Sequence, residues 1–250
     1  MGSKPNAIAA TGGYYPGLPM NTAIAHDPGS RSAHTLKAIS TVFVVDDDVS
    51  VRKSLELLID SAGWQPETFA SAEEFLSCPR VFAPSCLVLD VTLPDLNGLE
   101  LQKRVAADRA DMPIIFITGY GDVPMTVQAM KAGAMEFLTK PFRNDALLSA
   151  IEEALRRSHN ALDHEAEMQL LRGRYASLSV REREVMELVV SGLLNKHIGG
   201  KLGISEITVK AHRGKVMRKM QADSLADLVN IAARLHVAAP KEYAARSFSA

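Results

Sequence analysis

The sequence contains very little cysteine. Cys78 and Cys86 are the only two in 250 residues, and they stand eight positions apart. Without further partners they provide neither a disulfide framework nor a four-ligand zinc site. We therefore expect the protein to work in a reducing compartment.

Long apolar segments are also missing. No run of about 18 apolar residues, the length of a membrane-spanning helix, occurs in the chain. The first 40 residues lack the apolar core of a secretory signal. These absences predict a soluble, cytoplasmic protein with no membrane partner.

Neither sign of charge is in excess, because 28 Lys and Arg residues oppose 29 Asp and Glu residues, for a net charge of −1. A surface uniformly adapted to nucleic acid or to an anionic membrane is therefore excluded. The average conceals an asymmetry, however. Residues 38–157 hold 11 basic and 18 acidic residues, a net charge of −7, whereas residues 176–238 hold 10 and 6, a net charge of +4. An acidic domain is thus joined to a basic one.

The ends of the chain carry no helix or strand periodicity. Residues 1–38 are interrupted by proline and glycine, so we expect a disordered extension, and residues 239–250 form a tail without a pattern. Between them we place one domain at 39–157, a linker at 158–175 and a second domain at 176–238. Residues 144–172 contain neither Gly nor Pro, so the last helix of the first domain either continues into the linker or is broken near Ser158-His159-Asn160.

Short apolar runs alternate with amphipathic stretches across the first domain. The expected strands are near 42–45, 65–69, 86–89, 114–117 and 136–139, and the expected helices are 49–61, 72–77, 98–108, 123–131 and 144 onward. Runs that are apolar on both faces are typical of buried parallel strands joined by helical crossovers. The predicted fold class is α/β, a doubly wound five-stranded parallel sheet of order 2-1-3-4-5, followed by a small all-α domain.

Polar residues end four of these strands. Asp46 and Asp47 follow the first strand, Asp90 the third, Thr118 the fourth and Lys140 the fifth. In a doubly wound sheet these strand ends meet at the ligand-binding crevice. Three carboxylates there suit a hard cation such as Mg²⁺, and the cation and a lysine together suit a phosphoryl group. An aspartate can accept that group as an acyl phosphate, while Thr118 donates a hydroxyl hydrogen bond to the product.

The strings VVDDD (44–48), LVLDVTLPDLNGLEL (87–101) and FITGYGDVPMTVQAMKAGAMEFLTKPF (116–142) resemble the receiver domain of two-component response regulators. The resemblance, over about 120 residues, implies a flavodoxin-like fold and phosphorylation of Asp90 by a sensor histidine kinase. It implies that Asp46, Asp47, Asp90 and the main-chain carbonyl of Thr92 hold Mg²⁺. It also implies that Lys140 pairs with the phosphoryl group, that Thr118 and Phe137 form a switch, and that the Lys140–Pro141 peptide is cis.

A phosphatase of the haloacid-dehalogenase type is the competing enzymatic interpretation, since Asp46-Asp47-Asp48 contains an Asp-x-Asp spacing after the first strand. Such an enzyme needs a downstream acidic pair and a cap insertion. No adjacent Asp pair follows the fourth strand, and the domain has no room for a cap. We therefore expect the protein not to be an enzyme.

The second domain contains a helix-turn-helix pattern. Helices are expected at about 180–191, 195–202, 206–219 and 224–235, with a turn at Gly203-Ile204-Ser205. In helix 206–219 the apolar residues Val209 and Val216, with Met220 beyond it, define the core side, and His212 is interpreted as a packed structural residue. The outward side and its flanks predict DNA contacts by Thr208, Lys210, Ala211, Gly214, Lys215 and Arg218. Arg213 lies nearer the core side, and its long side chain is expected to reach a phosphate.

The string LSVREREVMELVVSGLLNKHIGGKLGISEITVKAHRGKVMRKM (178–220) resembles the LuxR-type DNA-binding domain. The pair of domains is similar to the LuxR/FixJ class of response regulators, in which the positions of Lys210, Ala211 and Gly214 face the bases. Two features depart from the family pattern, His197 and Gly199-Gly200. Each glycine is expected to destabilise the first helix by about 1 kcal/mol.

Together these features predict a response regulator transcription factor that is phosphorylated on Asp90. The expected partners are a histidine kinase, promoter DNA, RNA polymerase and, after phosphorylation, a second copy of the chain. The alternative is a phosphate-independent DNA-binding regulator whose first domain serves only for dimerisation.

Overall fold

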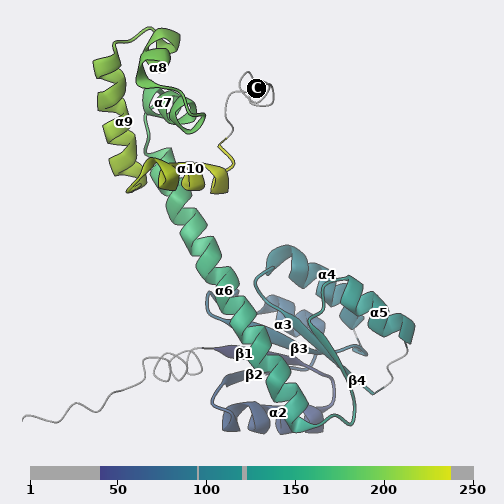
Figure 1. Cartoon of the computed structure of the whole chain (residues 1–250). Helices are drawn as coiled ribbons and strands as arrows, with labels where there is room; N and C mark the ends of the chain where they lie inside the picture. Colours follow the sequence, from purple (N-terminus) through teal and green to yellow (C-terminus); the bar gives the residue numbers. More distant parts are fainter. Residues whose placement is uncertain (1–39, 95, 120–122, 238–250) are drawn as a thin grey trace, which may run out of the picture.

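The computed structural model describes residues 40–94, 96–119 and 123–237. The predicted extension, 1–38, and the tail, 239–250, lie outside the described residues. The described chain forms an α/β part and a helical part, and one long helix, α6, belongs to both (Figure 1).

The five strands are β1 (Thr41–Val45), β2 (Gln65–Phe69), β3 (Ser85–Asp90), β4 (Ile114–Thr118) and β5 (Glu136–Thr139). They pair in parallel in the order β2-β1-β3-β4-β5. The predicted fold class is therefore confirmed. Every residue of the three inner strands is buried, which explains their apolar runs, whereas the two edge strands are partly exposed and more polar.

Helices cover both faces of the sheet. They are α2 (Val49–Ser61), α3 (Ala72–Ser77), α4 (Gly98–Asp108), α5 (Val123–Lys131) and the first half of α6 (Asn144–Ala176). Because alternate strand residues point to opposite faces, Val42 and Val44 pack with α2 and α6, whereas Phe43 and Val45 pack with α3 and α4. Burial of each such side chain stabilises the fold by about 1.5–3 kcal/mol.

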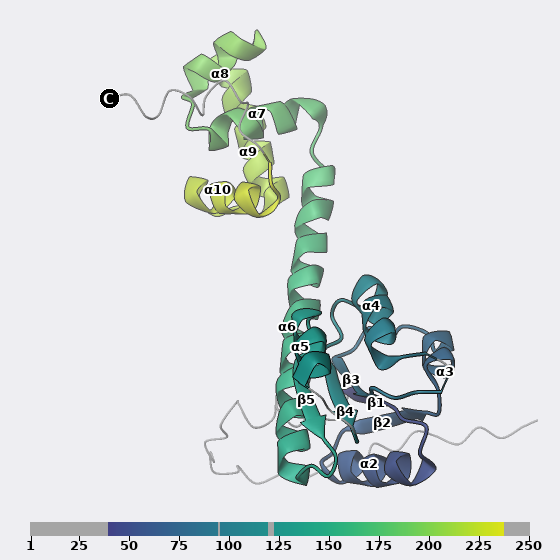
Figure 2. The same cartoon turned by 90° about the vertical axis from the view of Figure 1, so that its right-hand side faces the viewer.

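Helix α6 is continuous through Ser158, so of the two alternatives for the linker the chain adopts the continuous helix. Ser158 is fully buried, and its hydroxyl accepts a hydrogen bond of 3.0 Å from the backbone N–H of Ser85 at the start of β3. The polar residue that suggested a break is thus a contact between the helix and the sheet. Figure 2 shows α6 leaving the sheet and reaching the second part of the chain.

The last turns of α6 pack into a separate core. Met168 and Leu171 are buried there with residues of α7 (Val180–Val190), α8 (Asn195–Leu202), α9 (Glu206–Met220) and α10 (Leu225–Arg234). Three of these four helices begin with a serine that caps them: Ser179, Ser205 and Ser224. These capping residues explain why the helices start close to the predicted positions.

Candidate functional site

Three carboxylates lie together at the carboxyl ends of β1 and β3. Ligand atoms of Asp46, Asp47 and Asp90 lie within 4.8 Å of one another. Asp46 and Asp90 are buried, whereas Asp47 is exposed to solvent. A small hard cation with oxygen ligands fits such a set, since it would join buried charges that otherwise repel one another.

Lys140 joins two of these carboxylates. Its ammonium nitrogen lies 2.7 Å from Asp46 Oδ2 and 2.7 Å from Asp90 Oδ2. Burial acts to lower the pKa of Lys140, but the hydrogen bonds to Asp46 and Asp90 outweigh it and raise that pKa above the ordinary value. Lys140 is therefore charged at neutral pH. Lys140 directly follows β5, and the Lys140–Pro141 peptide is cis, as the sequence resemblance implies.

The second oxygen of each buried carboxylate accepts a backbone hydrogen bond. Asp46 Oδ1 accepts from the N–H of Asp48 and Asp90 Oδ1 accepts from the N–H of Thr92, both at 2.9 Å. Burial raises the pKa of Asp46, and its bonds from Lys140 and from the Asp48 N–H counteract that effect. The two side chains are thus held in place by contacts to both of their oxygens.

Asp48 has a separate, structural role. Its carboxylate caps α2 by accepting from the N–H groups of Ser50 and Val51, and these bonds lower the pKa of Asp48. The cap fixes the start of α2 directly after the acidic pair.

Thr118 and Phe137 lie on the neighbouring strands β4 and β5. Thr118 is buried, and its carbonyl accepts a bond of 2.7 Å from the backbone N–H of Lys140. Phe137 is half-buried, with its ring centroid 6.1 Å from that of Phe116. Thr118 thus ends the strand next to β3, which Asp90 ends, and Phe137 lies two residues before the end of β5.

Gly98 carries no distinguishing signal in the sequence, although it borders the site. A Cβ atom at this position would lie 2.6 Å from the carbonyl oxygen of Asp90, and the Gly98 N–H donates to the carbonyl of Val91 at 3.0 Å. Only glycine lets the start of α4 approach the Asp90 backbone this closely. A glycine at the start of a helix has many explanations, so the sequence alone does not indicate this one.

The helix-turn-helix comprises α8, a turn at Gly203, and α9. Val209, Val216 and Met220 are buried in its core, as their spacing predicts. Lys210, Ala211, Gly214, Lys215 and Arg218 are exposed. Together with Ile207, which is 80% exposed, they form the outer surface of α9.

Lys210 also pairs with Glu206 of α9 at 3.3 Å, and the other predicted contact residues, Thr208 and Arg213, make hydrogen bonds within the domain. Thr208 Oγ1 lies 2.8 Å from Ser205 Oγ in the cap of α9, and Arg213 Nη1 donates to Asn195 Oδ1 at 3.4 Å. His212 is half-buried, in agreement with a packed role, and its Nδ1 has no hydrogen-bond partner among the described residues.

Known proteins match both parts of the chain. The family described as "Response regulator receiver domain" matches residues 42–152, and "Bacterial regulatory proteins, luxR family" matches residues 176–232. "Nodulation protein W" of Bradyrhizobium diazoefficiens is 47% identical over 211 residues, covering 84% of this chain and 92% of that protein. The chain belongs to the LuxR/FixJ class of response regulators. It is a response regulator transcription factor with a receiver and a LuxR-type DNA-binding domain.

Further relatives agree with this assignment. "Transcriptional regulatory protein FixJ" of the same organism is 46% identical over 193 residues, covering 77% of this chain and 94% of that protein. A solved structure, that of the response regulator StyR, aligns with a TM-score of 0.72 at 48% identity, covering 79% of this chain and 100% of that chain. Among the described residues of the regulator, no helix is long and apolar enough to cross a membrane.

The two neighbouring glycines of α8 differ in the space around their Cα atoms. A Cβ atom on Gly199 would lie 2.7 Å from the carbonyl oxygen of Ile204, whereas one on Gly200 would meet nothing within 4 Å. The expectation that both glycines simply weaken the helix is therefore wrong for Gly199, which allows α8 to contact the turn. It remains a prediction for Gly200 alone.

Glu182 connects α9 to α7. Its carboxylate accepts from Lys219 Nζ at 2.7 Å and from the backbone N–H of Ser179 at 2.9 Å, completing a capping box. The Lys219 bond, followed by that from Ser179, lowers the pKa of Glu182 to about 2. Glu182 therefore stays ionised at neutral pH and holds the end of α9 in place.

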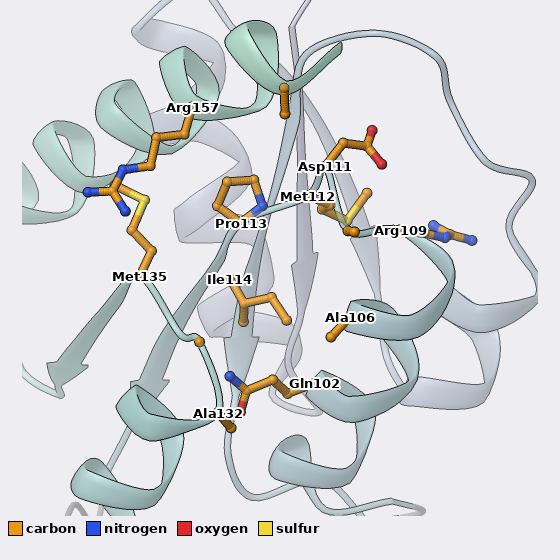
Figure 3. Close-up of a pocket in the computed structure, with 13 residues that line it drawn as sticks. Gln102, Ala106, Arg109, Asp111, Met112, Pro113, Ile114, Ala132, Met135 and Arg157 are labelled. Atoms are coloured by element: carbon orange, nitrogen blue, oxygen red, sulfur yellow. The ribbon is translucent and has the colours of Figure 1, made fainter. Parts of the chain in front are cut away.

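A pocket of about 370 Å³ lies beside the start of β4 (Figure 3). The carboxylates lie instead at the carboxyl ends of β1 and β3. The walls of the pocket include Gln102 from α4, Ile114 at the start of β4, Met135 before β5, and Arg157 from α6. Because Thr118 ends the strand that Ile114 begins, roughly 13 Å of strand separates the pocket from the site. The pocket is thus not part of the carboxylate site.

Proposed function

We propose that the regulator is phosphorylated on Asp90 by a sensor histidine kinase and that this modification controls its binding to promoter DNA. The observation that carries the proposal is the position of Lys140, which contacts the buried carboxylates of Asp46 and Asp90 at once. A lysine and several carboxylates drawn from separate strands have little structural use at a strand end but suit phosphoryl transfer.

The residues present fit a magnesium ion. Asp46, Asp47, Asp90 and the main-chain carbonyl of Thr92 would hold Mg²⁺, which would offset negative charge on the phosphoryl oxygens. An Asp90 carboxylate oxygen forms a bond to phosphorus as the bond from phosphorus to the kinase histidine nitrogen breaks. Lys140 then pairs with the phosphoryl oxygens, and the Thr118 hydroxyl donates to one of them.

The receiver offers a docking surface for the kinase beside Lys140. A groove of about 440 Å³ lies between α2 and the Lys140–Asn144 segment, and it is lined by Val51, Leu58 and Phe142. A kinase segment in this groove would place its phosphohistidine next to the carboxylates. We expect this encounter in the cytoplasm.

Phosphorylation would reach the surface through Thr118 and Phe137. When Thr118 moves toward the phosphoryl group, Phe137 turns inward and changes the surface formed by α5 and β5. That surface already exposes apolar residues, since Val123 is 76% exposed, Val127 44% and Met130 43%. We expect two phosphorylated copies to pair there. Coupling of this kind, here between phosphorylation and pairing, is typically worth about 1–3 kcal/mol of free energy.

The pairing would assist DNA binding by bringing two α9 helices onto successive half-sites. Lys210, Ala211 and Gly214 face the bases, and Thr208, Arg213, Lys215 and Arg218 contact bases or phosphates. The units of this mechanism are the receiver (39–157), the helical connector (158–175) and the DNA-binding domain (176–238). RNA polymerase is the downstream partner.

Sedimentation velocity tests the coupling. Beryllofluoride, which mimics the phosphoryl group, should shift the full-length protein from monomer toward dimer, and Val127→Glu on α5 should prevent that shift. Leu57→Glu, at a 73% exposed apolar position on α2, is the matched control and should leave the shift intact. Equal monomer fractions with and without beryllofluoride would contradict the mechanism.

A further inference from the structure

Arg52 approaches the carboxylate cluster from α2. It lies four residues after the helix cap Asp48, and its side chain is half-buried. One guanidinium nitrogen, Nη1, donates a hydrogen bond of 2.6 Å to the main-chain carbonyl of Asp46. A charge-assisted bond of this length is among the stronger contacts that hold a strand end.

The accepting carbonyl belongs to the peptide that joins Asp46 to Asp47. The Asp46 carboxylate has its own restraints, from Lys140 and from the Asp48 N–H. The Asp47 carboxylate is exposed, and among the described residues none donates a hydrogen bond to it or pairs with it. The direction of the Asp47 side chain is therefore set by its main chain, and Arg52 holds the peptide on its amino side.

We propose that Arg52 is a positioning residue for the cation site, which it serves by fixing the Asp46–Asp47 peptide so that Asp47 faces Asp46 and Asp90. This inference rests on the proposed function, since it concerns the Mg²⁺ of that site. Groups that orient metal ligands in this way typically change metal affinity by about 10- to 100-fold when they are removed.

The direction of the change in Mg²⁺ affinity when Arg52 is removed distinguishes a positioning role from a purely electrostatic one. A guanidinium near a divalent cation repels it, so if Arg52 acted through its charge alone, its removal would tighten Mg²⁺ binding. If Arg52 acts by holding the peptide, its removal weakens binding because Asp47 loses its direction. The two explanations predict opposite changes.

Calorimetric titration of the full-length, unphosphorylated protein with Mg²⁺ measures whether the affinity falls or rises. Arg52→Met removes the charge and keeps an apolar stem of similar length, and we expect about 10- to 100-fold weaker binding. Lys53→Met removes the same charge one residue along α2, where the side chain is exposed. This control should bind Mg²⁺ as tightly as the wild type, or slightly more tightly.

Arg52→Lys keeps the charge but not the guanidinium, and this variant should also bind Mg²⁺ more weakly than the wild type. If Arg52→Met fails to fold, Arg52→Lys still tests the positioning role. Unchanged or tighter binding in the folded Arg52 variants would overturn the positioning role while leaving the proposed function intact. A wild-type protein that binds no Mg²⁺ would instead refute the cation site itself, and the role of Arg52 with it.

Discussion

Asp90→Asn is expected to reduce phosphate incorporation from a small phosphodonor to background. The carboxamide has no anionic oxygen to form the acyl phosphate, although its size leaves the packing at the end of β3 unchanged. Chelation of Mg²⁺ should abolish incorporation into the wild type as well, because charge on the transferring oxygens would no longer be offset. Radiolabel transfer to the intact protein measures both effects.

Asp48→Asn is the matched control for this experiment. Asp48 lies beside the same cluster, but its carboxylate caps α2. Asparagine caps helices about as well as aspartate does, so this variant should fold and accept phosphate. Phosphate incorporation into Asp90→Asn, or incorporation into the wild type that continues after Mg²⁺ is chelated, would refute the assignment of Asp90 as the phosphorylated residue.

The second large effect is expected in DNA binding. Lys210→Ala should cost about 1–3 kcal/mol on a specific site and relax sequence preference, because a base contact is lost. Adding Lys215→Ala should weaken binding to all sequences and reduce the salt dependence, as the loss of a phosphate contact does. Fluorescence anisotropy at several salt concentrations separates the two effects.

Lys103→Ala removes the same charge from an exposed position on α4 of the receiver. It should leave DNA affinity unchanged, which controls for the net charge of the protein. If the Lys210→Ala, Lys215→Ala double variant also bound DNA like the wild type, the outer surface of α9 would not be the docking surface.

Much of the fold could be predicted because its signals are local. The three inner strands are buried on both faces, so their apolar runs are unambiguous. The buried side of α9 could be predicted from Val209, Val216 and Met220, because residues at that spacing lie on one side of a regular helix. The meeting of the carboxylates is equally predictable, since parallel strands end at one edge of the sheet.

The remaining features depend on contacts that are distant in sequence or that involve the main chain. Ser158 suggests a helix break by its residue type, and only its bond to Ser85, 73 residues away, explains why a serine is buried there. Gly199 resembles a weak helix residue because the approach of the Ile204 carbonyl leaves no trace in the sequence. Arg52 acts on a backbone oxygen, and backbone acceptors exist at every residue, so no spacing could identify it.

Control of DNA affinity by Asp90 phosphorylation is tested most directly by one titration. A specific promoter fragment is titrated with wild-type protein and with Asp90→Asn, each with and without a small phosphodonor and Mg²⁺. We predict that phosphorylation tightens wild-type binding by about 5- to 150-fold, equivalent to the usual 1–3 kcal/mol of coupling, and leaves Asp90→Asn unchanged. Equal affinities of the phosphorylated and unphosphorylated wild type would contradict this account and favour a phosphate-independent regulator.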